Sequence, residues 1–249
     1  MSKDPIRIAM WSGPRNISTA MMRAFENRDD TTVVDEPFYA AYLAASGADH
    51  PLRCEVLASQ PTDWRAVVNG LLAPPAGGRA VFYQKHMTHH MLPQFGRDWT
   101  RHCRNAFLIR QPIDVLASYA EVRDEASLEA IGLPQQCQLF DEVADRLGRP
   151  PPVVDAYDVL CDPSGTLRAL CVALDIPFSD AMLAWPAGRR ESDGVWAPAW
   201  YEAVERSTGF SPARHPLAFD ELRDDLRPVA EAALSFYQHL AAHKLRAQH

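Results

Sequence analysis

The sequence lacks the signals that would place it among secreted, disulfide-rich or membrane-spanning proteins. Its five cysteines are widely spaced and form no C-x-x-C pair, a pattern typical of reduced, buried thiols rather than of a disulfide scaffold. No apolar run approaches the ~18 residues needed to cross a bilayer. The opening MSKDPIRIAM has no apolar core of a secretory signal. We therefore expect a soluble, cytoplasmic protein.

An excess of positive charge is also missing. The formal net charge is −7 and the sequence pI is about 5.7, which excludes general nucleic-acid binding on electrostatic grounds. Internal repeats and low-complexity segments are absent too. The hydrophobic share of 47% and charged share of 23% over 249 residues are those of an ordinary globular chain. We expect one domain spanning residues 1–249.

One N-terminal stretch combines a strand, a basic turn and a helix start. Ile6 to Trp11 is a short apolar run of the kind that forms a buried parallel strand. Gly13, Pro14 and Arg15 follow, and the apolar residues after them have helical spacing. Backbone N–H groups at a helix start, where the helix dipole is positive, favour an anion. This stretch predicts a phosphate or sulfate site; the alternative is a basic turn without a ligand.

The nucleotide-binding pattern G-x-x-x-x-G-K-[ST] is not present at this turn. Gly13 matches its first glycine, but no Gly-Lys pair precedes Ser18 or Thr19. A kinase or nucleotide hydrolase is therefore the weaker interpretation.

Strand and helix patterns alternate along the next 150 residues. Further strands are expected at 31–35, 80–84, 105–109 and 153–156, with helices from Pro112 and near 164–174 and a loop with a short helix at 44–64. This order predicts an α/β fold with a mostly parallel sheet of about five strands and helices on both faces. Ligands of such sheets bind at the carboxyl ends of the strands.

The C-terminal third shows two different patterns. Residues 185–216 are rich in Trp, Pro and Gly and are interpreted as an irregular cap over the sheet. Residues 219–246 have amphipathic helical spacing, which we expect to break or kink at Pro228. The aromatic residues Phe38, Tyr39 and Tyr42, with Trp196 and Trp200, indicate either a ligand pocket or core packing.

Candidate chemical groups lie at the predicted strand ends. Arg110 and Ser118 are eight residues apart and could grip a second phosphate, or be an ordinary ion-pairing arginine and a surface serine. Glu36 could accept a proton or pair with an arginine. His86, expected first after its strand, could act as a general base.

The histidines His86, His89 and His90 have a spacing that would allow a metal site. No carboxylate or cysteine completes a recognised ligand pattern near them, so we expect none.

These pieces together resemble the sulfotransferases that use 3′-phosphoadenosine 5′-phosphosulfate (PAPS), which implies a P-loop-type three-layer sandwich. Four ordered stretches carry the resemblance, over roughly residues 6–178. They are Pro14-Arg15-Asn16-Ile17-Ser18-Thr19, Gln84 to Pro93, the set Arg110, Asp114 and Ser118, and Tyr157-Asp158-Val159-Leu160. In the family these correspond to the 5′-phosphosulfate loop, the catalytic-histidine segment, the 3′-phosphate motif and a strand end that helps to hold the adenine.

The resemblance implies a role for each matching residue. The loop from Gly13 to Thr19 would hold the 5′-phosphosulfate, with Arg15 in place of the family lysine and Ile17 in place of a glycine. Arg110 and Ser118 would hold the 3′-phosphate, and Tyr157 would lie against the adenine. Arg190 is a candidate for the family's last nucleotide loop. Lys85 would compensate for Gln84, which replaces the family lysine.

The implied reaction is in-line transfer of a sulfuryl group from PAPS to a hydroxyl or amine of a small molecule, without a metal. His86 or Glu36 would take the acceptor proton; Glu36 resembles a glutamate base of bacterial relatives, but His86 is the base that we expect. Two alternatives stay open: a P-loop kinase or nucleotide hydrolase, and a non-catalytic nucleotide-binding relative. No nucleic-acid or membrane partner is expected.

Overall fold

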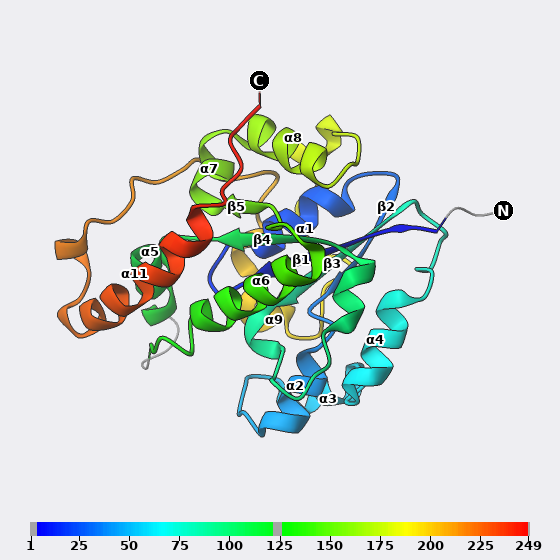
Figure 1. Cartoon of the computed structure of the whole chain (residues 1–249), viewed down its shortest axis with the longest axis horizontal. Coiled ribbons are helices and arrows are strands. Elements are labelled where there is room, and N and C mark those ends of the chain that lie inside the picture. The colour runs from blue at the N-terminus through cyan, green and yellow to red at the C-terminus, as the bar shows by residue number, and fades with distance from the viewer. Residues whose placement is uncertain (1–3, 122–125, 249) are drawn as a thin grey trace. The chain divides into compact units, whose positions relative to one another are not determined.

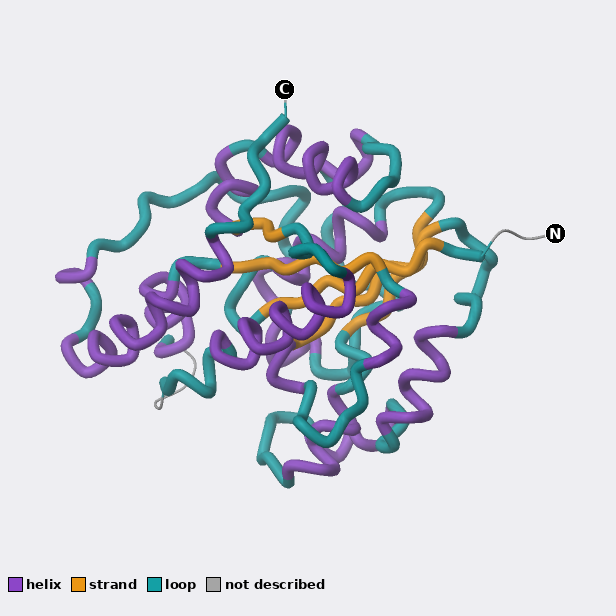
Figure 2. The backbone as a smooth tube through the Cα atoms, in the orientation of Figure 1, coloured by secondary structure: helices purple, strands orange, loops and turns teal. Residues whose placement is uncertain are grey.

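The computed structural model describes residues 4–121 and 126–248. Their strands form one parallel five-stranded sheet in the order β2-β3-β1-β4-β5, with helices around it (Figure 2). The strands are β1 (Ile6–Ser12), β2 (Thr31–Asp35), β3 (Val81–Met87), β4 (Arg104–Ile109) and β5 (Val153–Asp155). The expected α/β class with about five strands is confirmed.

The chain divides into two compact units, each assembled from separate segments. Unit 1 consists of Met1–Met10, Ser18–Arg104 and Ser179–Phe210. Unit 2 consists of Trp11–Ile17, Asn105–Phe178 and Ser211–His249. The expected single domain stays a prediction.

Unit 1 is built on the pairing of β2 with β3, which sets Asp35 opposite Lys85. Helix α1 (Ser18–Glu26) packs on both strands, and Phe25 stacks on Tyr83 at 4.3 Å between ring centroids. The other helices of the unit are α2 (Tyr39–Ser46), α3 (Arg53–Ser59), α4 (Trp64–Leu72), η1 (Thr88–His90), η2 (Asp98–His102), η3 (Asp180–Leu183), α9 (Ala197–Trp200) and α10 (Glu202–Glu205).

The aromatic residues singled out in the sequence belong largely to the core of this unit. Tyr39 and Trp196 are buried together with Tyr201, and Tyr42 and Trp200 pack against them. Their rings contact one another edge-on, as between Tyr39 and Trp196 at 5.1 Å. Of the two interpretations drawn from the sequence, core packing therefore describes these aromatic residues better than a ligand pocket does.

Unit 2 is built on the pairing of β4 with β5. Helix α11 (Arg227–Ala241) packs against α5 (Pro112–Ala120) and α6 (Leu133–Leu147) (Figure 1). A buried glutamine ties α6 to the strands, since Gln136 Nε2 donates to the carbonyl oxygens of Leu108 at 2.9 Å and Trp11 at 3.4 Å. The remaining helices of the unit are α7 (Ala156–Cys161), α8 (Pro163–Ala173), η4 (Phe219–Glu221) and η5 (Asp224–Leu226).

Two expected strand ends are wrong. β3 continues to Met87, so His86 lies within the strand and not after it. β5 ends at Asp155, whose carboxylate caps α7 by accepting from the Tyr157 N–H at 2.9 Å. Because the N-cap bond starts a helix there, Tyr157 belongs to a helical turn rather than to a strand end.

The C-terminal expectations need two corrections. Pro228 lies in the first turn of α11, where the missing N–H costs nothing, so it starts the helix and does not kink it. The segment 185–216 is not irregular throughout, because it contains α9 and α10, and its residues Trp196 and Tyr201 pack in the core of unit 1. The loop and short helix expected at 44–64 agree with the structure, where 53–59 forms α3. Among the described residues, no helix is long and apolar enough to span a membrane.

Candidate functional site

The loop between β1 and α1 is held in a strained, tightly packed conformation. Arg15 has a φ of 56°, a left-handed conformation that costs a non-glycine residue about 1 kcal/mol or more. A Cβ on Gly13 would lie 2.7 Å from the carbonyl oxygen of Ile131, so only glycine fits. Asn16 fixes the loop by donating to the Leu108 carbonyl at 3.1 Å and accepting from the Ile17 N–H.

Two sequence motifs meet on this loop within unit 2. Arg15 Nε donates to Ser118 Oγ at 3.0 Å, and Arg110 Nη1 donates to the Arg15 carbonyl at 2.8 Å. Burial lowers the pKa of Arg110, Asp114 raises it, and the nearby charges of Arg15 and Arg214 lower it further. Like-charged guanidinium groups whose charges act on one another in this way could together bind an anion with more than one negative charge.

Ser18 and Thr19 follow the loop directly as the first residues of α1 in unit 1. Their hydroxyls and backbone N–H groups are at a helix N-terminus, where the dipole favours an anion. The helix has nine residues.

A second cluster lies in unit 1 at the ends of β2 and β3. Lys85 Nζ contacts Asp35 Oδ1 at 2.8 Å, Glu36 Oε1 at 2.6 Å and the Tyr201 hydroxyl at 2.8 Å. The Lys85 and Asp35 side chains are 1% exposed, whereas Glu36 is 11% exposed. Glu36 has a φ of 38°, and its N–H donates to the Lys85 carbonyl at 3.0 Å. Its ionic partner is thus Lys85.

The protonation states in this cluster depend on burial and on mutual charge. Burial raises the pKa of Glu36, Lys85 lowers it and Asp35 raises it, so the net pKa lies above its usual value. For Lys85, burial lowers the pKa, but the charges of Asp35 and Glu36 outweigh burial and hold it well above its usual value. A carboxylate with a raised pKa is suited to accept a proton near neutral pH.

His86 lies on the opposite face of β3 from Lys85, because neighbouring residues of a strand alternate. Its ring contacts Phe38 and Trp99, and its Nε2 is 3.2 Å from Gln84 Oε1. Burial lowers its pKa to about 3. His86 is therefore a neutral imidazole packed in an aromatic environment, and its role as the base stays a prediction.

The neighbouring histidines are part of the same aromatic environment. His90 stacks on Tyr39 at 4.5 Å and contacts His89 edge-on at 4.4 Å. Within residues 4–121 and 126–248, no group of three or more His, Cys, Asp or Glu side chains is arranged to hold a metal ion.

The two remaining residues predicted to contact the nucleotide are Tyr157 and Arg190. Tyr157 is 39% exposed on α7 of unit 2, so its ring is available to a ligand. Arg190 is held near the C-terminal end of α1, with its Nε 4.0 Å from Glu26 Oε2 and its N–H bonded to Asp193. The nine-residue α1 puts this end about 12 Å from Ser18. Its role as a nucleotide ligand stays a prediction, which this placement does not favour.

Sequence reasoning missed Arg214, Asp35 and Tyr201. Asp35 was detectable as the last residue of its strand beside Glu36. Arg214 and Tyr201 belong to segments without periodic pattern, and only the folded chain brings them to Arg110 and Lys85.

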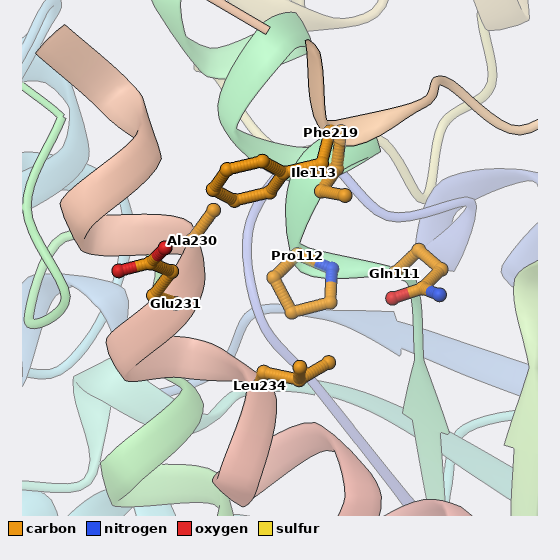
Figure 3. A pocket seen from close by; sticks show the side chains of 7 residues that line it. All are labelled: Gln111, Pro112, Ile113, Phe219, Ala230, Glu231 and Leu234. Carbon is orange, nitrogen blue, oxygen red and sulfur yellow. The ribbon is translucent and has the colours of Figure 1, made fainter. Parts of the chain in front are cut away.

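A hollow of about 270 Å³ lies in unit 2 and shares no lining residue with either cluster (Figure 3). Helices α5 and α11 and the short η4 contribute its lining, which is mostly apolar. It is lined by Gln111, Pro112, Ile113, Phe219, Ala230, Glu231 and Leu234. None of the sequence-predicted site residues is among them.

The family model described as "Sulfotransferase domain" matches residues 6–246. The chain belongs to this sulfotransferase family. The likeness inferred from four short stretches is thus confirmed and extends over nearly the whole chain, including the segment from 179 onward that carries Tyr201 and Arg214.

Solved structures agree on the fold of this sulfotransferase-family protein. A sulfotransferase from Alicyclobacillus acidocaldarius has a TM-score of 0.57 at 14% identity, with 98% of each chain covered. The sulfotransferase domain from the curacin biosynthetic pathway has a TM-score of 0.56 at 15% identity and covers 94% of this chain and 99% of its own.

Curated relatives with higher identity have names that refer to another reaction. Branched-chain-amino-acid aminotransferase-like proteins 1 and 2 of Arabidopsis thaliana are 39% and 36% identical over 241 and 237 residues. These matches cover 96% and 95% of this chain but 42% and 41% of the relatives. The sulfotransferase-family chain therefore spans less than half of their length.

Proposed function

We propose that the protein transfers a sulfuryl group from PAPS to a hydroxyl or amine of a small-molecule acceptor. The observation that carries this proposal is the joining of two motifs on one loop, through Arg15, Ser118 and Arg110. PAPS has a 5′-phosphosulfate and a 3′-phosphate, and this loop and arginine pair match two anionic groups on one ligand.

Each group of the donor would have its own partners. The backbone of Gly13 to Ile17, the charge of Arg15 and the hydroxyls of Ser18 and Thr19 would hold the 5′-phosphosulfate. Arg110, supported by Arg214, and Ser118 would hold the 3′-phosphate. Tyr157 would lie against the adenine, where its exposed ring can stack.

In the proposed transfer step, the acceptor oxygen or nitrogen attacks the sulfur atom of PAPS. The bond between sulfur and the bridging oxygen breaks, and the electron pair of that bond stays on the oxygen of the leaving 3′-phosphoadenosine 5′-phosphate. Arg15 and the loop N–H groups would stabilise the charge that grows on that oxygen. Positioning and charge stabilisation then supply most of the rate, as in phosphoryl transfer.

Glu36 is the base that the geometry supports best. Lys85 occupies one of its oxygens, and the raised pKa makes it a competent proton acceptor. His86, with its pKa lowered to about 3 and its ring among Phe38 and Trp99, is suited to a packing role.

The test is transfer of radioactive sulfur from labelled PAPS to a panel of phenols, alcohols and amines. We expect transfer by the wild type, a loss of at least ~100-fold in Glu36→Gln, as for removal of a general base, and retained activity in His86→Gln. Release of no labelled product with any acceptor, while PAPS binds, would leave the protein a binding relative and refute the proposal. Equal activity of Glu36→Gln and wild type would show that Glu36 is not the base.

A further inference from the structure

Tyr201, Asp35 and Lys85 each form a hydrogen bond with the other two. The Tyr201 hydroxyl donates to Asp35 Oδ2 at 2.7 Å and accepts from Lys85 Nζ at 2.8 Å and from Trp196 Nε1 at 3.1 Å. The Gly194 N–H donates to the same Asp35 oxygen at 3.3 Å. Residues 194–201 are thereby joined to the ends of β2 and β3.

Glu36 also contacts Lys85 and is the most exposed of the ionisable groups in this cluster. Its Oε1 is taken by Lys85, and its Oε2 lies 3.9 Å from Nδ1 of His90, a ring held neutral because burial puts its pKa well below the usual value. The titratable groups that face Glu36 are thus Lys85 on β3, Asp35 on β2, Tyr201 after α9 and His90 on η1.

The cluster around Lys85 holds more acidic side chains than basic ones. Two carboxylates share one ammonium in a buried site, so protonation of one carboxylate removes the excess negative charge. Asp35 has three donors in Lys85, Tyr201 and Gly194. Of the two acids, Glu36 is the one left to gain and lose the proton.

We propose that Asp35 and Tyr201 are positioning residues that fix the Lys85 ammonium on one oxygen of Glu36 and leave the other oxygen to take the acceptor proton. This inference rests on the proposed role of Glu36 in sulfuryl transfer. The segment 194–201, interpreted from the sequence as an irregular cap, supplies the hydroxyl that completes the arrangement.

The first test follows the Glu36 carboxyl carbon by NMR through a pH titration, with Glu36→Gln to assign the signal. Asp35→Asn removes a negative charge, so that Glu36 becomes the single carboxylate of the cluster that pairs with the Lys85 ammonium. We expect the pKa of Glu36 to fall by about one to three pH units, and the acid limb of kcat/KM to move to lower pH with it. An unchanged or higher pKa of Glu36 would overturn the proposal.

The second test uses the scarcity of lysine, since the sequence has only three, Lys3, Lys85 and Lys244. The enclosed Lys85 ammonium should give a slowly exchanging proton signal that is missing in Lys85→Met. Tyr201→Phe should abolish or strongly broaden this signal and lower kcat with little change in KM for PAPS. A sharp signal that persists in Tyr201→Phe would contradict the proposal.

Tyr237→Phe is the matched control. It also removes a tyrosine hydroxyl bonded to a strand-end aspartate, Asp155, at 2.6 Å, but in unit 2. The Lys85 signal and the Glu36 pKa should stay at their wild-type values in it. Because both NMR readouts need neither PAPS nor acceptor, they can succeed even if sulfuryl transfer is refuted, and fail even if transfer is observed.

Discussion

Arg15 Nε and Ser118 Oγ lie 3.0 Å apart, although 103 positions separate the two residues in the chain. The first belongs to the loop after β1 and the second to α5 (Pro112–Ala120), and Arg110, two residues before that helix, also bonds the loop carbonyl. The two motifs for which we propose phosphate binding are therefore joined by direct hydrogen bonds.

Arg110→Ala should distinguish the two phosphates of the nucleotide. We expect about 10- to 100-fold weaker binding of 3′-phosphoadenosine 5′-phosphate, the loss of one or two charge-assisted hydrogen bonds, and little change for AMP. Calorimetric titration measures both. The exposed Arg168→Ala is the control, and equal losses for both nucleotides would show that Arg110 does not read the 3′-phosphate.

Gly13→Ala should destabilise the loop by about 1–3 kcal/mol, because its Cβ would meet the Ile131 carbonyl oxygen at 2.7 Å. Gly70→Ala is a matched control in α4, where a Cβ would meet nothing within 4 Å and should be neutral or stabilising by up to ~1 kcal/mol. Urea unfolding compares them, and equal stabilities of the two variants would contradict the packing of the loop.

The sequence allowed the α/β class and the strand–loop–helix order of residues 6–26 to be predicted, because these depend on local signals such as apolar runs and helical spacing. Motif spacing also singled out Arg110 and Ser118, whose role in phosphate binding stays a prediction. The sequence did not predict the long helix α6. Its core-facing position Gln136 is polar and satisfied by the strand carbonyls of Leu108 and Trp11, so the apolar periodicity is interrupted there.

The unit 1 cluster was only half predictable for a related reason. Glu36 and Lys85 were noted at strand ends, but their pairing depends on the β2–β3 register. Tyr201 reaches them from more than 100 residues away, in a segment without regular pattern. The misplacement of His86 came from ending β3 too early, which turned an interior strand position into a strand end.

Lys85→Met should cost about 3–5 kcal/mol of unfolding free energy, because it leaves Asp35 and Glu36 buried without their cation. Lys244→Met removes a lysine that, like its 2.8 Å partner Asp158, is about one-third exposed. Its second partner, the buried Asp155, lies 3.9 Å away and keeps the hydrogen bonds from Tyr237 and the Tyr157 N–H, so the cost is limited to about 0–1 kcal/mol. Denaturant titration at neutral pH measures both. A similar small loss in the two variants would argue against a buried ionic cluster.

His86 should make stability depend on pH between 6.5 and about 3. The folded state keeps the ring neutral while the unfolded state takes up a proton below pH 6.5, so stability is present above that pH and is lost as pH falls. His86→Phe should therefore lose stability less steeply, by up to about 1.4 kcal/mol per pH unit. Above pH 7 the two stability curves should run parallel, and parallel curves throughout would place His86 in solvent.

Calorimetric titration of the wild-type protein with 3′-phosphoadenosine 5′-phosphate, beside ATP with Mg²⁺, tests the central claim most directly. The account predicts saturable binding of the bisphosphate without any metal and weaker binding of Mg-ATP. No binding of the bisphosphate, or a preference for Mg-ATP, would contradict a PAPS-dependent sulfotransferase and favour a kinase-like protein.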